Sequence, residues 1–373
     1  MTNPKKILHI FSTFEVGGAQ RRFANYVAKS GADFSHHIYA MDGCYDALQL
    51  VDGVSTIEDG QQVVAKGNTI AATLKCRKLL KKHKPDLLVT YNWGAIEWVL
   101  ANSLLALCPT IHIQDGFASD EQNKELFSRR VMRAFAYRWC TKVVVPSLTL
   151  LKQARKGWYL SAQKLAFIPN GIETARFGGA ADPDIVQAYD LKGTDIIVGT
   201  VAGLRLEKNV GRLIEAFSNI EDSHPECKLV IVGDGIGLAP LQMLADRVCR
   251  KGRVIFTRNM KRPEAILPAF DIFALSSDTE QMPLSVLEAM AAGLPVVSTD
   301  VGDIAEMVAP ENKPFIAGKN AKTLGENLTK IIEDTDLAIQ IGAKNKAKAE
   351  SIYGIERMVE TYDSLFQDTI KSP

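Results

Sequence analysis

The sequence predicts an α/β protein made of two doubly wound domains in series. Strand-like runs of nearly continuous apolar residues alternate with helical patterns along most of the 373 residues, which is typical of a parallel sheet covered by helices on both faces. The alternation restarts after a small, turn-rich stretch at 176–184, and a chain of this length is sufficient for two or three domains. We therefore expect one domain over 1–176 and a second over 177–352.

Each domain has its own series of elements. The first has expected strands at 7–12, 36–40, 86–91, 110–113 and 142–145, with helices from near Gly18 and over 68–84, 94–106 and 121–139. The second has expected strands at 195–201, 228–232, 254–257, 272–276 and 295–298, with helices over 210–220, 238–250 and 283–292. Residues 353–370 place apolar side chains at helical spacing, and such a helix must bury one face. We expect the terminal segment 353–373 to cross back onto the first domain.

Composition excludes several classes of protein. With 46% hydrophobic and 23% charged residues, the chain is not mainly disordered. No run of about 18 apolar residues occurs, so no transmembrane helix is expected. The apolar run at 7–11 is too short for a signal peptide. The six cysteines include no Cys-x-x-Cys pair, so we expect reduced thiols and a cytoplasmic location.

The charge is divided unevenly between the two halves. The net charge is +1, but residues 1–180 hold 23 basic and 14 acidic side chains, whereas residues 181–373 hold 21 and 29. The neutral total argues against a nucleic-acid-binding protein. The basic excess of the first half indicates a partner that is anionic or lies at a membrane.

The clearest chemical pattern lies between residues 280 and 290. An expected strand ends near Ser277, and a helix begins at Pro283, a residue favoured in the first helical turn. Glu280 then lies at the carboxyl end of the strand, and Glu288 lies about two turns further along. Carboxylates accept paired hydrogen bonds from vicinal hydroxyl groups, and the free amides of a helix N-terminus bind anions or hydroxyl-rich ligands. The pattern suits a sugar and a ribose, but a solvated carboxylate and a helix-surface glutamate would explain the two residues alone.

The same stretch resembles the retaining GT-B glycosyltransferases of the large family four, in which a Glu-x7-Glu pattern recurs. Further segments that resemble this family lie along nearly the whole chain, at 17–21, 168–172, 199–209, 230–235 and 299–302. The resemblance implies two Rossmann-like domains facing across a cleft, with the acceptor on the first and the nucleotide-sugar on the second. It implies a retaining transfer to a glycan or lipid-linked acceptor in polysaccharide, glycolipid or related envelope glycan synthesis.

The resemblance also implies roles for individual residues. Arg205 and Lys208 hold the donor diphosphate, Glu288 binds the ribose, and Glu280 with nearby backbone amides binds the sugar. Fixed cations stabilise the charge that develops on the departing phosphate oxygen, so neither a metal nor another cofactor is expected. The other implied donor-binding residues are Arg258, Gln281, Met282, Pro283 and Leu284.

Two features of the first domain have both a functional and a structural explanation. Gly17 and Gly18 separate a strand from a helix, where glycine lets the backbone approach a ligand closely. Family members place this loop near the acceptor, and a tight turn without a ligand is the alternative. His112 ends the strand at 110–113, and family members carry in this region a histidine that contacts the transferred sugar. A packed strand histidine is the alternative.

Two departures from the family pattern leave the donor open. Gln281 stands where many relatives have glycine, and Arg258 follows a strand where relatives usually have glycine near the nucleotide base. UDP is therefore assigned from its frequency in the family. Two other functions also remain open, a nucleotide-sugar epimerase on the same fold and a non-catalytic sugar-nucleotide-binding subunit.

Basic residues crowd two expected helices of the first domain. They are Lys75, Arg77, Lys78, Lys81, Lys82 and Lys84 on one helix, and Arg129, Arg130, Arg133 and Arg138 on the other. Basic amphipathic helices lie on anionic membrane surfaces, gaining about 1 kcal/mol for each well-placed charge. The alternative is a solvated face over a core stripe. We expect a cytoplasmic protein that associates peripherally with the inner face of the membrane.

Overall fold

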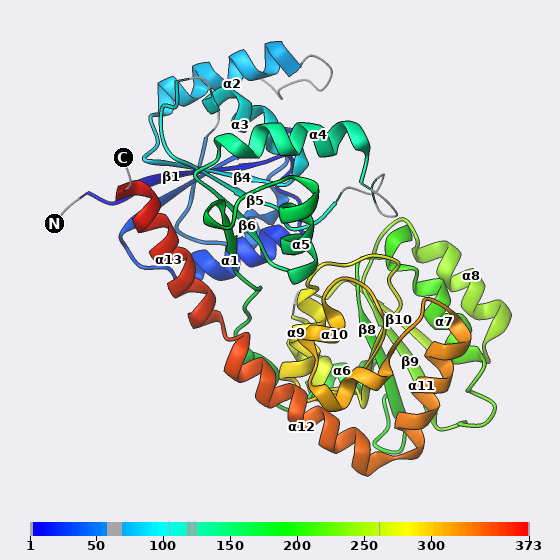
Figure 1. Ribbon diagram of the computed structural model, residues 1–373. Coiled ribbons are helices and arrows are strands. Elements are labelled where there is room, and N and C mark those ends of the chain that lie inside the picture. The colour runs from blue at the N-terminus through cyan, green and yellow to red at the C-terminus, as the bar shows by residue number, and fades with distance from the viewer. Residues whose placement is uncertain are drawn as a thin grey trace. The chain divides into compact units, whose positions relative to one another are not determined.

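The computed structural model describes residues 3–57, 69–103, 105–117, 121, 125–260 and 262–371 (Figure 1). The chain forms two compact units, Met1–Gly171 with Ile355–Pro373 and Ile172–Gly354. The boundary lies slightly before the turn-rich stretch, because the Ile172 amide donates to the Tyr353 carbonyl at 2.9 Å and Ile172 pairs with Gly354. These contacts attach Ile172 to the second unit.

In the part of the chain that the structure describes, the first unit contains a seven-stranded parallel sheet and the second a six-stranded one. In the first sheet the strands lie in the order β3 (Ser55–Thr56), β2 (Phe34–Ala40), β1 (Lys5–Phe11), β4 (Leu87–Tyr91), β5 (Thr110–Ile113), β6 (Lys142–Val145) and β7 (Leu165–Phe167). The chain reverses its direction of travel across this sheet between β1 and β4. Ligands of doubly wound sheets bind beside such a switch point, beyond the carboxyl ends of the strands.

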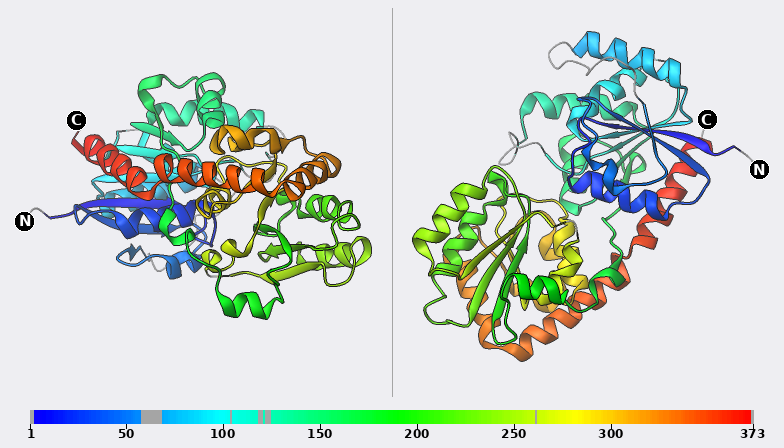
Figure 2. Two further views of the ribbon diagram at one scale, coloured as in Figure 1. Left: turned by 90° about the horizontal axis from the view of Figure 1, so that it is seen from below. Right: turned by 180° about the vertical axis from the view of Figure 1, so that it is seen from behind.

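Helices cover both faces of the first sheet (Figures 1 and 2). They are α1 (Gly18–Lys29), α2 (Thr69–His83), α3 (Ile96–Ser103), α4 (Phe127–Ala136), α5 (Leu148–Gly157) and α13 (Ile355–Lys371). The terminal helix α13 packs beside α1, with the rings of Tyr362 and Phe366 at 5.6 and 5.7 Å from that of Tyr26. The Tyr26 hydroxyl donates to Asp363 at 2.7 Å. These contacts make the terminal helix part of the first unit's core.

The second sheet follows the order β10 (Val254–Arg258), β9 (Cys227–Val232), β8 (Ile196–Val201), β11 (Ile272–Leu275), β12 (Val296–Thr299) and β13 (Ile316–Ala317). Its helices are α6 (Pro183–Ala188), α7 (Val210–Ser218), α8 (Leu238–Val248), α9 (Leu284–Ala291), α10 (Ile304–Met307), α11 (Ala321–Glu333) and α12 (Thr335–Ile352). Separate apolar clusters fill the two faces of this sheet. The switch point lies between β8 and β11, so the loops after these strands are the ones expected to bind a ligand.

The predicted α/β class with two parallel sheets is confirmed, but one expected helix is much shorter than its pattern suggests. The pattern predicts a helix over 121–139, whereas α4 begins at Phe127 and ends at Ala136. The carboxylate of Glu121 accepts a hydrogen bond from the Leu126 amide at 3.1 Å and binds the guanidinium of Arg133. Because Glu121 meets Arg133 from outside the helix, it cannot be part of the same continuous helix.

No helix among the described residues is long and apolar enough to span a bilayer. The six cysteines, all within the described ranges, are free thiols.

Candidate active site

Three loops of the second unit meet at the carboxyl edge of its sheet. They follow β8, β11 and β12 and cover residues 202–209, 276–283 and 300–303. The Asp278 amide donates to the Glu207 carbonyl at 2.8 Å, and the Asp303 amide donates to the Gln281 carbonyl at 2.9 Å. The backbone therefore ties the loop after β11 to both of its neighbours.

Lys208 and Glu280 form the centre of this edge. The Lys208 ammonium lies 2.5 Å from Glu280 Oε1, and the Ser277 hydroxyl donates to the same oxygen at 2.8 Å. The two charged side chains are 17% and 9% exposed. A charge-assisted hydrogen bond with so little solvent around it is stronger than one on an open surface. Glu280 is thus held in one orientation, with its second carboxylate oxygen remaining as an acceptor.

A single 3-10 turn places Arg205 and Lys208 together. This turn, Leu206–Lys208, is closed by the Lys208 amide donating to the Arg205 carbonyl at 3.0 Å. Residues three apart in such a turn lie on the same side. The Arg205 side chain is 63% exposed and contacts Glu207 at 2.9 Å. The loop therefore carries two cations three residues apart: Arg205 is exposed and paired with Glu207, and Lys208 is nearly buried and paired with Glu280.

An arginine–aspartate pair supports this loop from the side. Asn209 adopts a left-handed backbone with φ of 41° and begins α7, and its side-chain amide donates to Asp278 at 3.1 Å. Arg212 donates to Asp278 at 2.6 Å and to the Ser276 carbonyl at 2.7 Å. The loops that carry Lys208 and Glu280 are therefore linked by side chains as well as by backbone.

The helix α9 supplies the remaining predicted donor-site residues. Pro283 is its N-cap residue, in an extended conformation, and makes no side-chain capping hydrogen bond. The first amides of the helix have no acceptor within the helix itself. Met282 is buried, and Glu288 is half-buried two turns along the helix. Gln281 is half-buried, and its carbonyl is the acceptor for the Asp303 amide.

Gly302 is the point of closest approach between two of these loops. Its backbone has φ of +58°, and a β-carbon there would lie 2.5 Å from the Glu280 carbonyl oxygen and 2.6 Å from that of Gln281. Any other residue would therefore push directly on the backbone that carries Glu280. The glycine in this segment is required by packing next to the candidate site.

Arg258 lies at a different part of the same edge. It ends β10 with a left-handed backbone, φ +59°, and its side chain is exposed. Its carbonyl accepts from the Gly233 amide at 3.0 Å, which joins the loops after β9 and β10. A shallow hollow of about 360 Å³ lies beside it, with Thr257 and Asn259 in its lining. Arg258 is therefore separated by one strand from β8, whose loop carries Lys208, and by two strands from β11, whose loop carries Glu280.

The first unit has its own polar edge, after β1, β4 and β5. Gly17 and Gly18 start α1, and neither has a positive φ. A β-carbon on Gly18 would meet no atom within 4 Å. The glycine there is not required by packing within the described structure.

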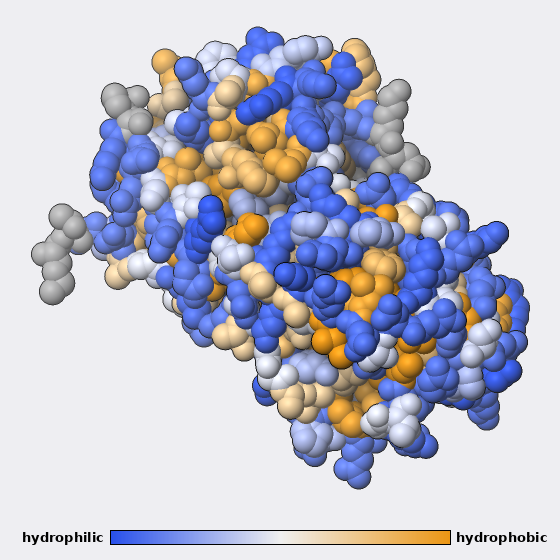
Figure 3. Space-filling model, turned by 60° about the horizontal axis from the view of Figure 1, so that its bottom comes forward, coloured by the Kyte–Doolittle hydropathy of each residue, from blue (hydrophilic) through white to orange (hydrophobic). Residues whose placement is uncertain are grey.

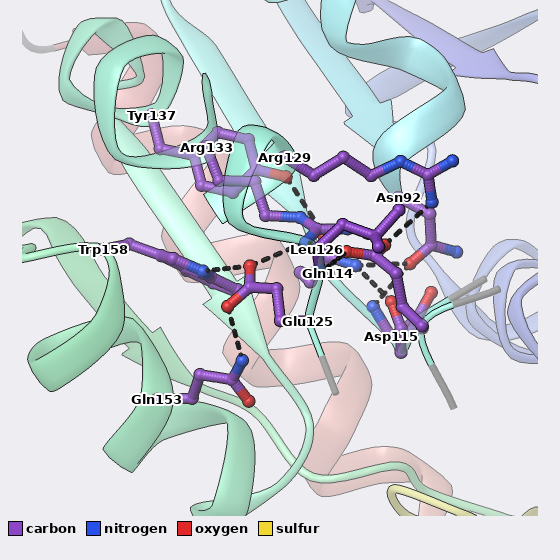
Figure 4. Close-up of polar contacts among 12 residues, drawn as sticks. Asn92, Gln114, Asp115, Glu125, Leu126, Arg129, Arg133, Tyr137, Gln153 and Trp158 are labelled. Atoms are coloured by element: carbon purple, nitrogen blue, oxygen red, sulfur yellow. Dashed lines mark hydrogen bonds and ion pairs between the residues drawn. The ribbon is translucent and has the colours of Figure 1, made fainter. Parts of the chain in front are cut away.

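A buried ion pair lies behind this glycine loop. The guanidinium of Arg22, on α1, forms two hydrogen bonds with the carboxylate of Asp115, one of them at 2.9 Å. Their side chains are 4% and 17% exposed. Asn92, after β4, accepts from the Asp115 amide at 2.8 Å. Figure 4 shows Asn92, Gln114 and Asp115 grouped at this edge. Asp115 is thus fixed by both its backbone and its carboxylate, at the carboxyl end of β5.

The two units match two halves of one enzyme family. Residues 17–176 match Glycosyltransferase Family 4, and residues 182–348 match Glycosyl transferases group 1. The chain belongs to this family of glycosyltransferases. Its sequence is 26% identical over 304 residues to the UDP-Gal:alpha-D-GlcNAc-diphosphoundecaprenol alpha-1,3-galactosyltransferase of Escherichia coli, covering 79% of this chain and 78% of that protein. It is 23% identical over 339 residues to a glycosyltransferase of Methanocaldococcus jannaschii, covering 80% and 83%.

Solved structures show the same fold. The crystal structure of Anabaena Alr3699/HepE in complex with UDP and glucose superposes with a TM-score of 0.81 at 18% identity, covering 98% of this chain and all of that one. At this identity the likeness establishes the GT-B fold, which the sequence predicted.

The side chain of His112 in this glycosyltransferase is buried against the first sheet. The ring is fully buried, stacks on Tyr137 at 4.3 Å and bonds with Thr90 at 2.8 Å and Gln114 at 3.3 Å. Burial lowers the pKa of His112 to about 3, so the ring is neutral near pH 7. This environment is that of the packed strand histidine named as the alternative, and the contact with the transferred sugar stays a prediction. Side chains along β5 alternate between the two faces of the sheet, and His112 lies on a face that Tyr137 covers.

Several site residues of this glycosyltransferase lie outside the sequence prediction. Arg22, Asp115, Arg212 and Asp278 form paired contacts that a single sequence does not reveal, because their partners are 66 to 93 residues apart. One weak signal was present, since Asp115 and Asp278 both follow expected strands. Polar residues in that position are brought together at the carboxyl edge of a parallel sheet.

Proposed function

We propose that this glycosyltransferase moves a hexose from a UDP-sugar to a glycan or lipid-linked acceptor with retention of anomeric configuration. The observation that carries the proposal is the contact of Lys208 with Glu280 at the carboxyl edge of the second sheet, 2.5 Å long and nearly buried. It unites a fixed cation for a phosphate with a fixed carboxylate for sugar hydroxyl groups. Both are needed where a nucleotide-sugar reacts.

The donor diphosphate is proposed to lie against the Arg205–Lys208 turn. Arg205 is exposed, and its planar guanidinium is proposed to exchange the contact with Glu207 for phosphate oxygens, whereas Lys208 is held by Glu280. The open amides at the start of α9 add dipoles for the same charge. Glu288 is proposed to bind the ribose, and the backbone near Gln281, Met282, Pro283 and Leu284 to line the sugar. Arg258 and the hollow beside Thr257 are proposed to lie near the base.

The chemical step is proposed to be attack of the acceptor on the same face from which the nucleotide leaves. The bond between the anomeric carbon and the β-phosphate oxygen breaks, and the acceptor oxygen forms the new bond to that carbon. The departing phosphate oxygen takes the proton of the acceptor hydroxyl. Lys208 and Arg205 stabilise the charge on that oxygen as it develops, which lowers the barrier without a covalent sugar–enzyme intermediate.

The reaction is proposed to need no metal ion and no cofactor, since Arg205 and Lys208 are proposed to balance the charge of the diphosphate. UDP as the nucleotide is supported by the E. coli relative, whose name specifies UDP-Gal, and by HepE, whose structure contains UDP. The same relative's name specifies a diphosphoundecaprenol-linked acceptor. This supports a lipid-linked acceptor and a peripheral position at the inner face of the membrane.

The first unit is proposed to bind the acceptor. Gly18 leaves open space at the start of α1, and the Asp115 carboxylate lies at the end of β5 with its orientation fixed by Arg22. A fixed carboxylate there can hold an acceptor hydroxyl group. The contact of His112 with the transferred sugar, which the resemblance implies, remains a separate part of the proposal.

The proposal is tested with purified enzyme, a panel of UDP-, GDP-, ADP- and dTDP-sugars and a panel of glycan and lipid-linked acceptors. The donor should raise the melting temperature, and NMR of the product should show the anomeric configuration of the donor retained. Activity should persist in EDTA. Inversion of configuration would refute the proposed step. Nucleotide release without an acceptor, with an epimeric sugar formed, would indicate an epimerase, and tight binding without turnover would indicate a non-catalytic subunit.

A further inference from the structure

Helix α4 of the first unit is packed with its charges inward and its apolar residues outward. Arg133 is completely buried, and Arg129 is 21% exposed. On the other side of the helix, Phe127 is 74% exposed, and Val131 and Phe135 are each 51% exposed. A water-soluble helix ordinarily shows the reverse arrangement. The basic residues expected on a solvated face are therefore only partly solvated.

The inward side is held by a network of carboxylates and aromatic rings (Figure 4). Arg133 binds Glu121 at 2.6 and 2.8 Å and Glu125 at 2.6 Å, and its guanidinium lies 5.0 Å from the ring of Trp93. The Trp158 indole N–H donates to Glu125 at 2.8 Å. These contacts fix the rotation of α4 about its axis. The outward direction of its apolar side is thus a property of the folded unit.

The outward side is one continuous row. Phe127, Val131 and Phe135 are four residues apart and follow one face of the helix. Trp139, 53% exposed, continues the row in the 3-10 turn Tyr137–Trp139, and Leu126, 41% exposed, precedes it. We call these five residues the α4 ridge. Single exposed apolar residues are common, but a row that includes three aromatic rings indicates a binding surface. In Figure 3, exposed hydrophobic residues gather in patches among hydrophilic ones.

The charged residues of the ridge's own segment, 126–142, are all basic. Arg130 and Arg138 are exposed, and the Arg130 guanidinium lies 5.9 Å from the Phe127 ring. The segment 126–142 contains no Asp or Glu. Pairing of two copies through this ridge would bring like charges together with no acid to balance them, which costs free energy. An anionic surface satisfies both the apolar row and the arginines.

We propose that the α4 ridge inserts into the interfacial layer of an anionic lipid bilayer, with Arg130 and Arg138 on the lipid headgroups. Aromatic side chains favour this depth, and arginine side chains reach from it to phosphate groups. The ridge lies in the first unit and shares no residue with the donor site. The inference deepens the proposed membrane position by naming its anchor, but it does not depend on the donor, the metal or the stereochemistry proposed above.

The test measures flotation of the full chain with phosphatidylcholine vesicles, with and without phosphatidylglycerol. The ridge variant is F127S/V131S/F135S, and the charge variant is R130Q/R138Q. The matched control is M243S/I339S, which removes two residues of the second unit that are 74% and 66% exposed. The ridge variant should lose at least about tenfold in affinity for the anionic vesicles. The charge variant should lose about fivefold per arginine on anionic vesicles only. The control should bind as the native chain does.

A fluorescence measurement covers the case in which the ridge variant misfolds. Native Trp139 should shift its emission to the blue on anionic vesicles, and Trp139→Phe should abolish that shift. Equal flotation of the ridge variant and the control would overturn the proposal, as would absence of vesicle binding at low salt. A concentration-dependent dimer that the ridge variant loses, without vesicle binding, would assign the surface to a second copy instead. Donor-induced thermal shifts in the ridge variant test the donor site separately.

Discussion

Gly302→Ala should damage catalysis much more than stability, although Gly302 carries no functional group. Its β-carbon would lie 2.5 Å from the Glu280 carbonyl oxygen, while ordinary contact begins near 3.4 Å. One of the two loops must therefore move by about 0.9 Å. Lys208 and Ser277 bind the Glu280 carboxylate. Movement of the Glu280 backbone would therefore stretch or break these contacts and shift the carboxylate from the position proposed for binding the sugar.

The magnitudes of the two effects differ. A displacement of about 1 Å in a reacting geometry costs about 100-fold in rate, and we expect kcat to fall by this factor. A left-handed backbone at a residue with a β-carbon costs about 1–2 kcal/mol. For a unit of this size that lowers the melting temperature by about 2–8 °C.

The assay compares kcat and melting temperature of Gly302→Ala with those of Gly252→Ala. Gly252 also has a positive φ, +81°, but a β-carbon there would meet no atom within 4 Å. The control therefore carries the backbone strain without the collision. Its melting temperature should fall by a comparable amount while its kcat stays near that of the native enzyme. If Gly302→Ala retained native kcat with only the control's loss of stability, the role assigned to this contact would be refuted.

Three further predictions follow from other contacts. Lys208→Ala should lower kcat by about 100- to 1,000-fold with intact folding, measured by initial rates and circular dichroism; near-native rates would remove Lys208 from the diphosphate site. Asp115→Asn should lower the free energy of unfolding, measured in urea, by about 3–5 kcal/mol, because the charge of Arg22 is left buried without a carboxylate partner. The double variant Arg22→Met with Asp115→Leu should lower the free energy of unfolding by less, because it leaves no buried charge. Burial lowers the pKa of His36 to about 4 and that of His9 well below its usual value. As the pH falls, these histidines bind protons in the unfolded chain at a higher pH than in the folded chain. The free energy of unfolding should therefore be unaffected by them above about pH 6.5 and should fall toward pH 4 by up to about 1.4 kcal/mol per pH unit for each histidine. A melting temperature that did not change between about pH 6.5 and pH 4 would contradict the assignment of His9 and His36 as buried neutral histidines.

Much of the fold follows from local pattern. The expected strands at 110–113 and 142–145 coincide with β5 and β6, and α1 begins at Gly18 as predicted. Continuous apolar runs identify central strands because both of their faces are buried. The two- and three-residue strands β3, β7 and β13 were not predicted, since strands of that length exist only by pairing with a neighbour.

The candidate site was predictable to the extent that it depends on strand ends. Lys208 and Glu280 are 72 residues apart. The resemblance to the family singled out both residues, and their positions after strands of one parallel sheet are consistent with the contact that the structure shows between them. For His112 the sequence predicted a position near a strand end, and the structure adds that the ring is fully buried. That burial could not be predicted, because the direction in which a strand residue faces depends on the register and on the layers that cover the sheet.

The sequence alone therefore determined the class of fold, the family and the loops proposed to carry the donor site, since these depend on apolar periodicity and short motifs. Only the tertiary structure decided which residues meet and which face of a helix turns inward. The pairs Arg22–Asp115 and Arg212–Asp278 join segments far apart in the chain. Helix α4 shows the same limit, because periodicity reveals that its apolar and basic residues occupy opposite faces. In the structure Glu121, Glu125 and Trp93 contact Arg133 on the inward face, and Phe127, Val131 and Phe135 are left on the exposed face.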